Sequence, residues 1–463
     1  MPAHPFDPSA SLPSAPLGAC SRAFGRYASL TDLRALMAAT DRPLRKSVRV
    51  NTLKCSVEDF KAWAKEKGWS LSPVPWCPEG FFIERENRET ALGRDLRHLL
   101  GHFYMQESAS MLPAALLDPH PGEAILDLCA APGSKTTQIA ARLQGRGLVV
   151  ANDMQEKRLR VLNDALQRTG ATTVVITRKV GQWFSKHLTE RFDRVLCDAP
   201  CTAQGTARKD PTALQYSSQD SIEKAARLQY QLLEAAVHAA KVGGRIVYST
   251  CTLTPEENES VVLEILNKFS DQIEVVHPKE ALASGLDWDM SAAISDSETV
   301  QRFLSPSSLV LRPFLRLWPQ TYDTEGFFCA VLKKVKPTRA VEPLEMYQRV
   351  ALPFGRKKTE AVSKLFMEQF GTDFRLPGEC LIEKGQQLLL SGEEAYGFPL
   401  PVTEYAMGIP FAKILQDGRF RITNELASLR GHLAACGVME LSQNQLDALL
   451  DGKDIPVDPS LRG

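Results

Sequence analysis

The chain has 463 residues, of which 44% are hydrophobic and 24% charged, as expected of a folded protein with a large core and roughly two to four domains. Its 55 Lys and Arg residues balance 55 Asp and Glu residues, so no global basic field indicates a nucleic-acid partner, and any such partner would need local basic patches. The ten cysteines form no CxxC pair and no Cys/His cluster at zinc spacing, which argues against a metal site.

Residues 1–18 are rich in Pro, Ser and Ala and are predicted to form a disordered tail. They lack the apolar segment of a secretory signal, and no apolar run in the chain reaches the roughly 18 residues of a membrane span. Dispersed cysteines are typical of a reducing compartment. The sequence therefore predicts a cytoplasmic protein with no membrane partner.

Residues 19–98 are predicted to form an α+β accessory domain. A helical region extends from Cys20 to about Asp41, residues 47–54 alternate as a strand does, and an amphipathic helix follows Ser56 as far as Gly68. A basic cluster surrounds the strand and consists of Arg42, Arg45, Lys46, Arg49 and Lys54. Composition alone leaves open whether this cluster is a solvated face or a surface for a polyanion.

Residues 99–335 alternate strands with helices, the pattern of a parallel sheet covered on both faces. Strands are predicted at 124–127, 148–153, 173–177, 192–198, 245–249 and 326–332, and helices at 134–143, 156–168, 221–241 and 256–269. The Gly243-Gly244 pair is expected to end the helix 221–241. Three of the strands end in an acidic residue: Asp127, Asp153 and Asp198.

A linker is expected to begin at Val335, and the character of the chain changes after about residue 345. Short strands are predicted within 374–390, 412–415 and 419–421, and short helices at 425–433 and 443–450. This pattern indicates a compact α+β module or a small β-barrel, without a recognisable catalytic group.

The segment that organises the central region is Asp127-Leu128-Cys129-Ala130-Ala131-Pro132-Gly133-Ser134-Lys135, a strand end, a Pro-Gly turn and the start of a helix. Open α/β sheets hold cofactors at such places, outside the carboxyl ends of their strands. The segment lacks the glycines of a Walker loop or of a dinucleotide fingerprint, so by itself it also fits an ordinary turn. Asp153 stands about twenty residues further on, where such sheets place a carboxylate for ribose hydroxyls.

Two cysteines follow neighbouring strand tips, Cys201 in the run 198–201 and Cys251 in the run 249–252. Because the carboxyl ends of parallel strands share one edge, both are expected to meet the segment 129–135. Either cysteine alone is more often a small buried residue, whereas two beside a cofactor loop favour chemistry. Nearby positive charge would lower a thiol pKa, and it is available from Lys135, Arg208 and Lys209.

Together these motifs resemble the Nop/Sun family of S-adenosylmethionine-dependent RNA cytosine-C5 methyltransferases, over about residues 20–335. Other segments that carry the resemblance are 49–54, 104–107, 205, 208–211 and 326–328. The run 208–211 and the C-terminal extension look most like the bacterial branch that methylates small-subunit ribosomal RNA, where the extension is a PUA-like RNA-binding module. The resemblance implies a Rossmann-like, seven-stranded methyltransferase sheet in residues 99–335, an RNA-binding N-terminal domain, and an α+β, PUA-like RNA-binding region in residues 336–463.

The resemblance also implies roles for individual residues. Cys251 would be the nucleophile that adds to C6 of cytosine, Cys201 would assist product release, and Asp198 would hydrogen-bond N3 and the amino edge of the base. S-adenosylmethionine would be held by Cys129, Ala130, Ala131, Pro132, Gly133, Ser134, Lys135, Asp153 and Asp198. Val180 departs from the family, because an acid that contacts adenine is usual there, so weaker or differently arranged adenine binding is expected.

The partner implied is RNA, with ribosomal RNA favoured and transfer RNA open, and a monomer is expected. The target cytosine must be unpaired or flipped out of its helix. An amino-methyltransferase is disfavoured because Pro200 is followed by Cys201 rather than by Pro and an aromatic residue. A ribosome-assembly factor with weak catalysis is disfavoured by the intact Asp198 and both cysteines, although Val180 mildly favours it.

Overall fold

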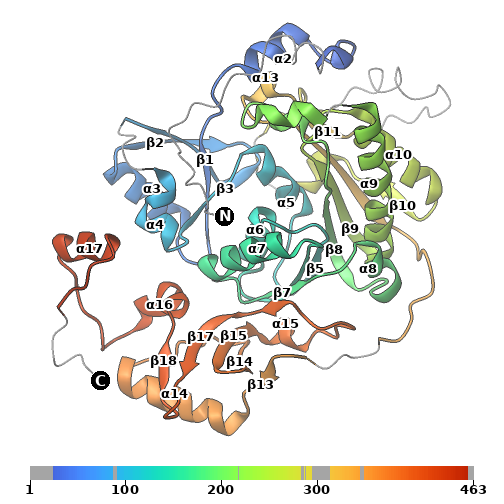
Figure 1. Cartoon of the computed structure of the whole chain (residues 1–463). Coiled ribbons are helices and arrows are strands. Elements are labelled where there is room, and N and C mark those ends of the chain that lie inside the picture. Colours follow the sequence, from blue (N-terminus) through green and yellow to red (C-terminus); the bar gives the residue numbers. More distant parts are fainter. Residues whose placement is uncertain are drawn as a thin grey trace, which may run out of the picture.

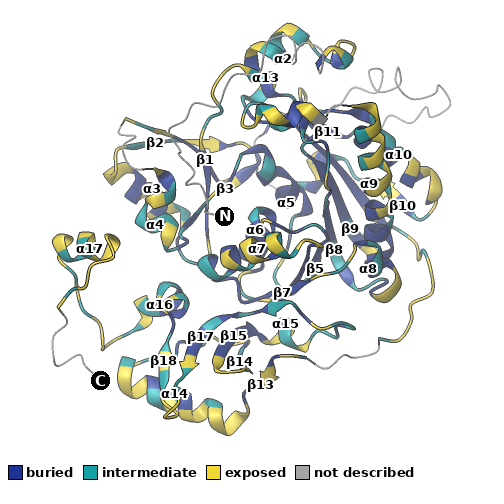
Figure 2. Ribbon diagram, in the orientation of Figure 1, coloured by how far each residue is buried: buried dark blue, intermediate teal, exposed yellow. Residues whose placement is uncertain are grey.

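The computed structural model describes residues 24–86, 91–216, 218–282, 286, 288–294, 313–344 and 349–456, so the tail predicted for residues 1–18 lies outside them. Figure 1 shows a small N-terminal sheet, a large central α/β region and a C-terminal sheet at the bottom of the view. Figure 2 shows that the central strands are buried and that the surrounding helices expose their outer faces. No described helix is long and apolar enough to cross a bilayer.

The N-terminal part is an antiparallel sheet in the order β2-β3-β1-β4. Its elements are α2 (Leu33–Thr40), β1 (Ser47–Val50), α3 (Val57–Glu66), β2 (Trp69–Val74), β3 (Cys77–Arg85), α4 (Leu96–Leu99) and β4 (Phe103–Met105). Ser56 caps α3 as its sequence predicts, because its hydroxyl accepts a hydrogen bond from the Asp59 N–H at 3.0 Å. Since β4 pairs with β1, this sheet continues past residue 98.

The central sheet has the order β10-β12-β9-β8-β5-β6-β7-β16, and β11 pairs with β12. Its strands before the C-terminal part are β5 (Ala124–Asp127), β6 (Leu148–Asn152), β7 (Val174–Thr177), β8 (Phe192–Asp198), β9 (Ala240–Thr250), β10 (Ile273–Val275), β11 (Leu315–Leu317) and β12 (Phe327–Lys334). Strands β5 to β9 pair in parallel, and β12 pairs antiparallel with β9. The Rossmann-like α/β fold is confirmed, with β11 and β16 added to the seven strands from β10 to β7.

Helices cover both faces of this sheet. Their bounds are α5 (Leu112–Leu117), α6 (Ser134–Leu143), α7 (Glu156–Thr169), α8 (Gln182–His187), α9 (Gln219–Ala239), α10 (Glu259–Lys268), α11 (Pro278–Ala281) and α13 (Pro319–Tyr322). Apolar residues of α5, α6 and α7 pack in one hydrophobic cluster, and those of α8, α9 and α10 pack in another. The two-faced burial explains why the central strands read as continuous apolar runs.

The end of α9 differs from the prediction. The helix stops at Ala239, and residues 241–244 form a bulge between the pairs Phe192–Ala240 and Arg194–Arg245. Gly243 has φ +86° inside this bulge. The glycine pair therefore lies in an irregular part of β9 and does not end the helix. Gly243 adopts in this bulge a positive φ of the kind that also occurs at helix ends.

The C-terminal part is an antiparallel sheet in the order β13-β14-β15-β17-β18. Its elements are β13 (Leu352–Pro353), α14 (Arg356–Phe370), β14 (Glu379–Lys384), β15 (Gln387–Gly392), α15 (Glu393–Gly397), β16 (Ala406–Met407), β17 (Ile409–Ile414), β18 (Phe420–Ile422), α16 (Asn424–Arg430) and α17 (Gln443–Leu450). Helix α14 was not predicted. The short strand β16 is not part of this sheet. It pairs antiparallel with β7, so the C-terminal part adds a strand to the central sheet.

A candidate active site at the carboxyl edge of the central sheet

The strand tips that were predicted to converge lie together. Parallel pairing places Asp198 beside Ser249, and the Sγ atoms of Cys201 and Cys251 are 3.3 Å apart. Nζ of Lys135, in the first turn of α6, lies 2.7 Å from Oδ2 of Asp198. The Ser249 hydroxyl donates to Oδ1 of Asp198 at 2.7 Å. The structure thus brings both cysteines, Asp198 and the end of the segment 129–135 to one edge.

The turn between β5 and α6 is fixed from two sides. Gly133 has φ +110°, and a Cβ added there would lie 3.0 Å from Cδ1 of Leu162, so the turn requires glycine. Arg49 reaches this turn from β1 and donates to the Ser134 carbonyl at 2.7 Å and to Oγ1 of Thr137 at 2.9 Å. A buried arginine of the N-terminal sheet therefore supports the start of α6.

This position of Arg49 corrects the interpretation of the basic cluster. Arg49 is only 1% exposed, and Nζ of Lys54 donates to the carbonyls of Leu100 and Arg168 at 2.8 and 2.9 Å. Two of the five basic residues are therefore internal supports, while Arg42, Arg45 and Lys46 keep surface exposure. The alternation of the strand did not reveal this, because all four residues of β1 are buried.

Two carboxylate oxygens at this edge accept no hydrogen bond from the described residues: Oδ1 of Asp127 and Oδ2 of Asp153. Both side chains are buried, and burial raises the pKa of Asp127 to about 7. Oδ2 of Asp153 is met only by the guanidinium of Arg158, in an ion pair of 2.8 Å. A buried acceptor without a donor, as Oδ1 of Asp127 is, marks a place that a ligand can complete, and Asp153 follows the neighbouring strand β6, where such sheets bind ribose hydroxyls. These two residues therefore fit a nucleoside cofactor.

The other residues predicted to hold the cofactor lie in the same turn. Ala130 and Ala131 are buried, Cys129 is half-buried, and burial raises the pKa of the Cys129 thiol. The Ala130 N–H donates to the Asn152 carbonyl at 2.8 Å, which ties the turn to the tip of β6. The peptide bond between Ala131 and Pro132 is cis. The predicted segment therefore forms a continuous turn that is held against the end of β6, which Asp153 directly follows.

Val180 follows the tip of β7 and has half of its side chain exposed, at 51%. The preceding residue, Lys179, is fixed through its backbone, because its N–H and carbonyl both hydrogen-bond to the Asn152 side chain at 2.9 Å. The same side-chain amide donates to the Leu128 carbonyl at 3.2 Å. The backbone at this tip is thus held in place, while Val180 itself offers no side-chain acceptor.

A buried glutamate joins the two loops that carry the cysteines. Glu257, in the turn Pro255–Glu257, is fully buried and accepts several hydrogen bonds. It accepts from the Thr202 N–H at 3.0 Å, the Gln229 side-chain amide at 2.8 Å, the Thr254 hydroxyl at 2.8 Å and the Thr252 hydroxyl at 3.3 Å. The Thr202 hydroxyl is a fifth donor. Thr202 follows Cys201, and it hydrogen-bonds at 3.1 Å to Thr252, which follows Cys251. Glu257 therefore sets the positions of both thiols.

Two motif glycines bring a third loop against Cys251. The Gly205 N–H donates to the Cys251 carbonyl at 2.9 Å, and the Gly326 N–H donates to the Gly205 carbonyl at 2.9 Å. A Cβ on Gly205 would lie 2.3 Å from the Gly326 oxygen, which no side chain tolerates. The absence of side chains at these two positions therefore permits the close approach of the loops.

The predicted lowering of a thiol pKa is not found at Cys201. Its hydrogen bond with Cys251, together with burial, raises the pKa of Cys201. Lys135 is paired with Asp198, and Arg208 donates to Asp323 at 2.8 Å and to the Thr324 carbonyl at 3.1 Å. Lys135 and Arg208 thus have other partners, so neither lowers the pKa of Cys201.

Two further acids, Glu107 and Glu325, lie near Lys135, and their proximity was not predicted. The Glu325 N–H donates to Oε1 of Glu107 at 3.3 Å, and the Ser110 N–H donates to Oε2 of Glu107 at 3.2 Å. The Ser110 hydroxyl in turn accepts from Nζ of Lys135 at 3.0 Å. Burial, followed by the charge of Glu107, raises the pKa of Glu325 to about 8, and burial raises the pKa of Glu107.

Stability should therefore depend on pH. Between the ordinary value of 4.5 and about 8, the unfolded chain loses the Glu325 proton that the folded protein keeps, so the free energy of unfolding should fall as pH rises through this window. Glu325→Gln cannot ionise and should flatten the profile in urea unfolding measured from about pH 5 to about pH 9. Asp127, whose raised pKa lies in the same window, should leave a residual slope.

The exposed acid Glu58 provides the control, because Glu58→Gln changes the same group where solvent surrounds it. Its profile should follow that of the unmodified protein. If the Glu325→Gln profile also runs parallel to the unmodified one, the buried acid does not hold its proton.

Similar proteins are found for most of the chain. Residues 114–333 match the family model described as 16S rRNA methyltransferase RsmB/F, and residues 25–108 match the N-terminal domain of 16S rRNA methyltransferase RsmF. A protein from Psychromonas ingrahamii named ribosomal RNA small subunit methyltransferase F is 36% identical over 429 residues, 90% of this chain and 84% of that protein. A protein of the same name from Shewanella sp. (strain ANA-3) is 37% identical over 434 residues, 91% and 85% of the two chains. A solved structure of a methyltransferase homolog from Pyrococcus horikoshii shares 33% identity and a TM-score of 0.56, over 69% of this chain and 98% of that one.

Proposed function

The chain belongs to the RsmB/F family of 16S rRNA methyltransferases and is an S-adenosylmethionine-dependent methyltransferase, and from this premise we propose that it methylates C5 of a cytosine in small-subunit ribosomal RNA. The observation that carries the proposal is the pair of thiols 3.3 Å apart beside the Lys135–Asp198 ion pair. Cytosine-C5 chemistry needs a nucleophile and a second proton-carrying group within reach of one base.

Cys251 provides the nucleophile in this proposal. C5 of cytosine is too weakly nucleophilic to accept a methyl group unaided, whereas addition of the Cys251 thiolate to C6 makes C5 enamine-like. The cofactor supplies an electrophilic methyl group when bound. The methylated C5 then gives its proton to Cys201 in its thiolate form, the electron pair of the C5–H bond re-forms the C5=C6 double bond, and Sγ of Cys251 leaves C6 as a thiolate. Cys201 lies 3.3 Å from Cys251 and so can assist this release.

Asp198 orients the base. Its two oxygens are already directed by Lys135 and by the Ser249 hydroxyl, each at 2.7 Å, and a quarter of its side chain stays exposed. The exposed edge can accept a hydrogen bond from the amino group of a flipped cytosine, and from N3 once the ring of the covalent adduct is protonated there. Because the Lys135 charge balances Asp198, this contact brings no unpaired charge into the site.

The cofactor would be held by the segment Cys129–Lys135 and by Asp153, with Asp153 taking the ribose hydroxyls. The unpartnered Oδ1 of Asp127 and the buried carboxylate of Asp153, which pairs with Arg158 at 2.8 Å, support this placement. Val180 provides no acceptor for the adenine amino group, and the loss of one such hydrogen bond costs on the order of 1 kcal/mol, or a few-fold in affinity. The segment and Asp153 therefore carry more of the binding in this chain.

The N-terminal and C-terminal parts, on either side of the methyltransferase domain, would bind RNA. We assign residues 19–98, together with the strand β4 that completes their sheet, and the PUA-like residues 336–463 to RNA binding. The methyltransferase domain between them begins after β4 and ends at residue 335, in a cytoplasmic monomer. The three surface cations Arg42, Arg45 and Lys46 support the N-terminal contact. Their contribution would weaken as salt concentration rises.

Bisulfite sequencing of RNA from cells with and without this protein tests the proposal. At least one cytosine of the small-subunit RNA should lose its protection when the protein is absent, and the native chain should restore it, whereas Cys251→Ala should not. Loss of protection in transfer RNA alone would assign the other substrate. Unchanged protection in both RNA classes would overturn the assignment.

A further inference from the structure

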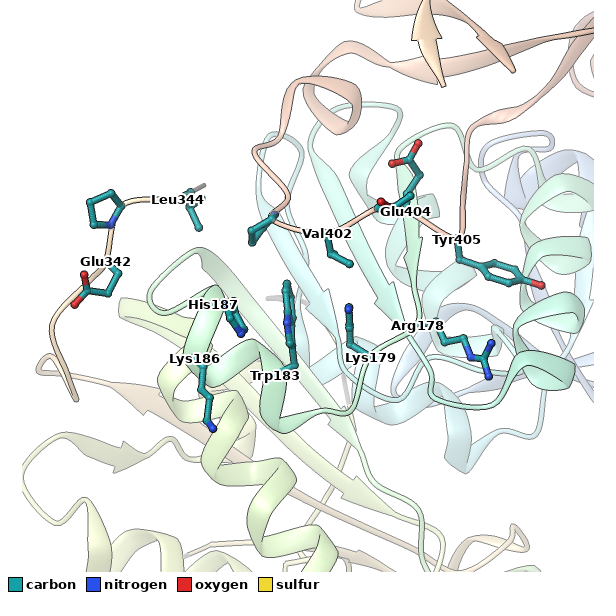
Figure 3. Close-up of a pocket in the computed structure, with 13 residues that line it drawn as sticks. Arg178, Lys179, Trp183, Lys186, His187, Glu342, Leu344, Val402, Glu404 and Tyr405 are labelled. Carbon is teal, nitrogen blue, oxygen red and sulfur yellow. The ribbon is translucent and has the colours of Figure 1, made fainter. Parts of the chain in front are cut away.

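A groove of about 950 Å³ lies between α8 and the segment 401–405 (Figure 3). Its position follows from the register of β16, where Ala406 pairs antiparallel with Ile176 and the Tyr405 N–H donates to the Ile176 carbonyl at 2.8 Å. The residues before Tyr405 therefore run past the carboxyl end of β7. Arg178 and Lys179, which follow the carboxyl end of β7, line one part of the groove, and Asp198 ends the strand β8 at the same edge of the sheet.

The lining of the groove is mainly positive, although the chain as a whole has no net charge. Three cationic residues, Arg178, Lys179 and Lys186, line it together with His187, and its acids are Glu342 and Glu404. Glu404 is buried, and its Oε1 accepts hydrogen bonds from the Val350 and Ala351 N–H groups at 3.2 Å, which stabilise part of its charge. Within the described residues, Lys179 and Lys186 form no ion pair, so both can meet an anion.

An aromatic ring stands among these cations. Trp183 lies between the His187 ring, stacked at 4.6 Å, and Nζ of Lys179, 5.5 Å from its ring centre, as Figure 3 shows. A base that stacks on this ring would take the place of the Lys179 ammonium group, which no ion pair fixes within the described residues, while Asn152 holds the Lys179 backbone. Basic residues around a stackable aromatic ring are the elements that bind single-stranded nucleic acid.

We propose that this groove binds a single-stranded stretch of the substrate RNA next to the target cytosine, with one base on Trp183 and phosphates against Lys179 and Lys186. The proposal rests on RNA being the substrate and adds a contact site to it. Neighbouring strands lie about 4.8 Å apart, so β7 stands roughly 15 Å from β8 and its Asp198, a span that a few nucleotides cross. The RNA would pass over the edge of the sheet from one site to the other.

The test uses the full-length protein in four forms: unmodified, Trp183→Ala, Lys186→Ala and the control Lys224→Ala, which changes an exposed lysine of α9 outside the groove. Binding of a fluorescent oligouridylate is measured by anisotropy across a salt series, together with KM for small-subunit RNA and Kd for S-adenosylmethionine. Trp183→Ala should weaken oligouridylate binding roughly 5- to 100-fold. Lys186→Ala should lower the salt slope by about 0.7, and Lys224→Ala should change neither quantity.

The exposed position of Lys186 keeps the test valid if Trp183→Ala loses stability. Unchanged RNA affinity and salt slope in Lys186→Ala and in folded Trp183→Ala would overturn the groove, while methylation by the unmodified protein would still support the proposed function. A raised Kd for S-adenosylmethionine with unchanged RNA binding would also overturn it, because the groove would then be the adenine end of the cofactor site. Absence of methylation by the unmodified protein would instead count against the proposed function.

Discussion

Replacement of Cys251 by alanine should abolish methyl transfer, and replacement of Cys201 should stop the reaction one step later. Without the Cys251 thiolate no bond to C6 forms, so the rate should fall by roughly 10⁴-fold or more. Without Cys201, whose Sγ lies 3.3 Å from that of Cys251, the adduct forms but is released slowly. Cys201→Ala should therefore accumulate protein–RNA complexes that survive a denaturing gel, whereas Cys251→Ala and the double variant should give none.

The measurement combines radiolabelled methyl transfer with denaturing electrophoresis. Cys436→Ala serves as the control, because it removes an exposed thiol of the C-terminal part and should leave both readouts unchanged. Activity in Cys251→Ala together with adducts in that variant would reverse the two roles. Activity in Cys251→Ala without any adduct would show that the reaction does not use this covalent route.

Replacement of Glu257 by alanine should cost both stability and activity. The change leaves several buried donors without an acceptor, including the Thr202 N–H and the Gln229 amide. It should lower the free energy of unfolding by about 3–5 kcal/mol. Glu257→Gln should recover a large part of this loss, since its amide oxygen can serve those two donors while the threonine hydroxyls rotate to accept from its nitrogen. Urea unfolding gives the stability of each variant.

Activity, measured where each variant is folded, separates positioning from stability. If Glu257 fixes both thiols, Glu257→Ala should lose methyl transfer even where it is fully folded, and Glu257→Gln should lie between it and the unmodified protein. Glu264→Ala, on the exposed side of α10, should match the unmodified protein in both assays. Full activity of folded Glu257→Ala would show that the loops keep their places without it.

The convergence of the catalytic groups could be predicted because it depends on local patterns. Asp198, Cys201 and Cys251 each follow an apolar run that forms a buried strand, and parallel pairing puts all such tips at one edge. The turn at Gly133 could also be predicted from the local sequence, since a strand end, a Pro-Gly pair and a helix start follow one another there. These features need no knowledge of how distant segments pack.

The supports of the site depend on distant packing and were missed for that reason. Glu257 stands next to Glu256 at a helix start, where acids are usual on exposed surfaces, and only the folding of α9 brings Gln229 to it. Arg49 lies in a basic run that suggested RNA, yet the N-terminal sheet carries it to α6. The Glu107–Glu325 contact likewise joins segments more than two hundred residues apart.

The short strand β16 has a consequence for how the protein can be divided. Without it, β7 would end the central sheet with a row of unpaired N–H and carbonyl groups, a surface on which other chains readily add strands. The pairing of Ala406 and Met407 with Ile176 and Val175 covers part of that row. The C-terminal part thus covers an edge strand that could otherwise pair with another chain. A shortened chain that ends at the linker would expose β7 and would tend to self-associate along it.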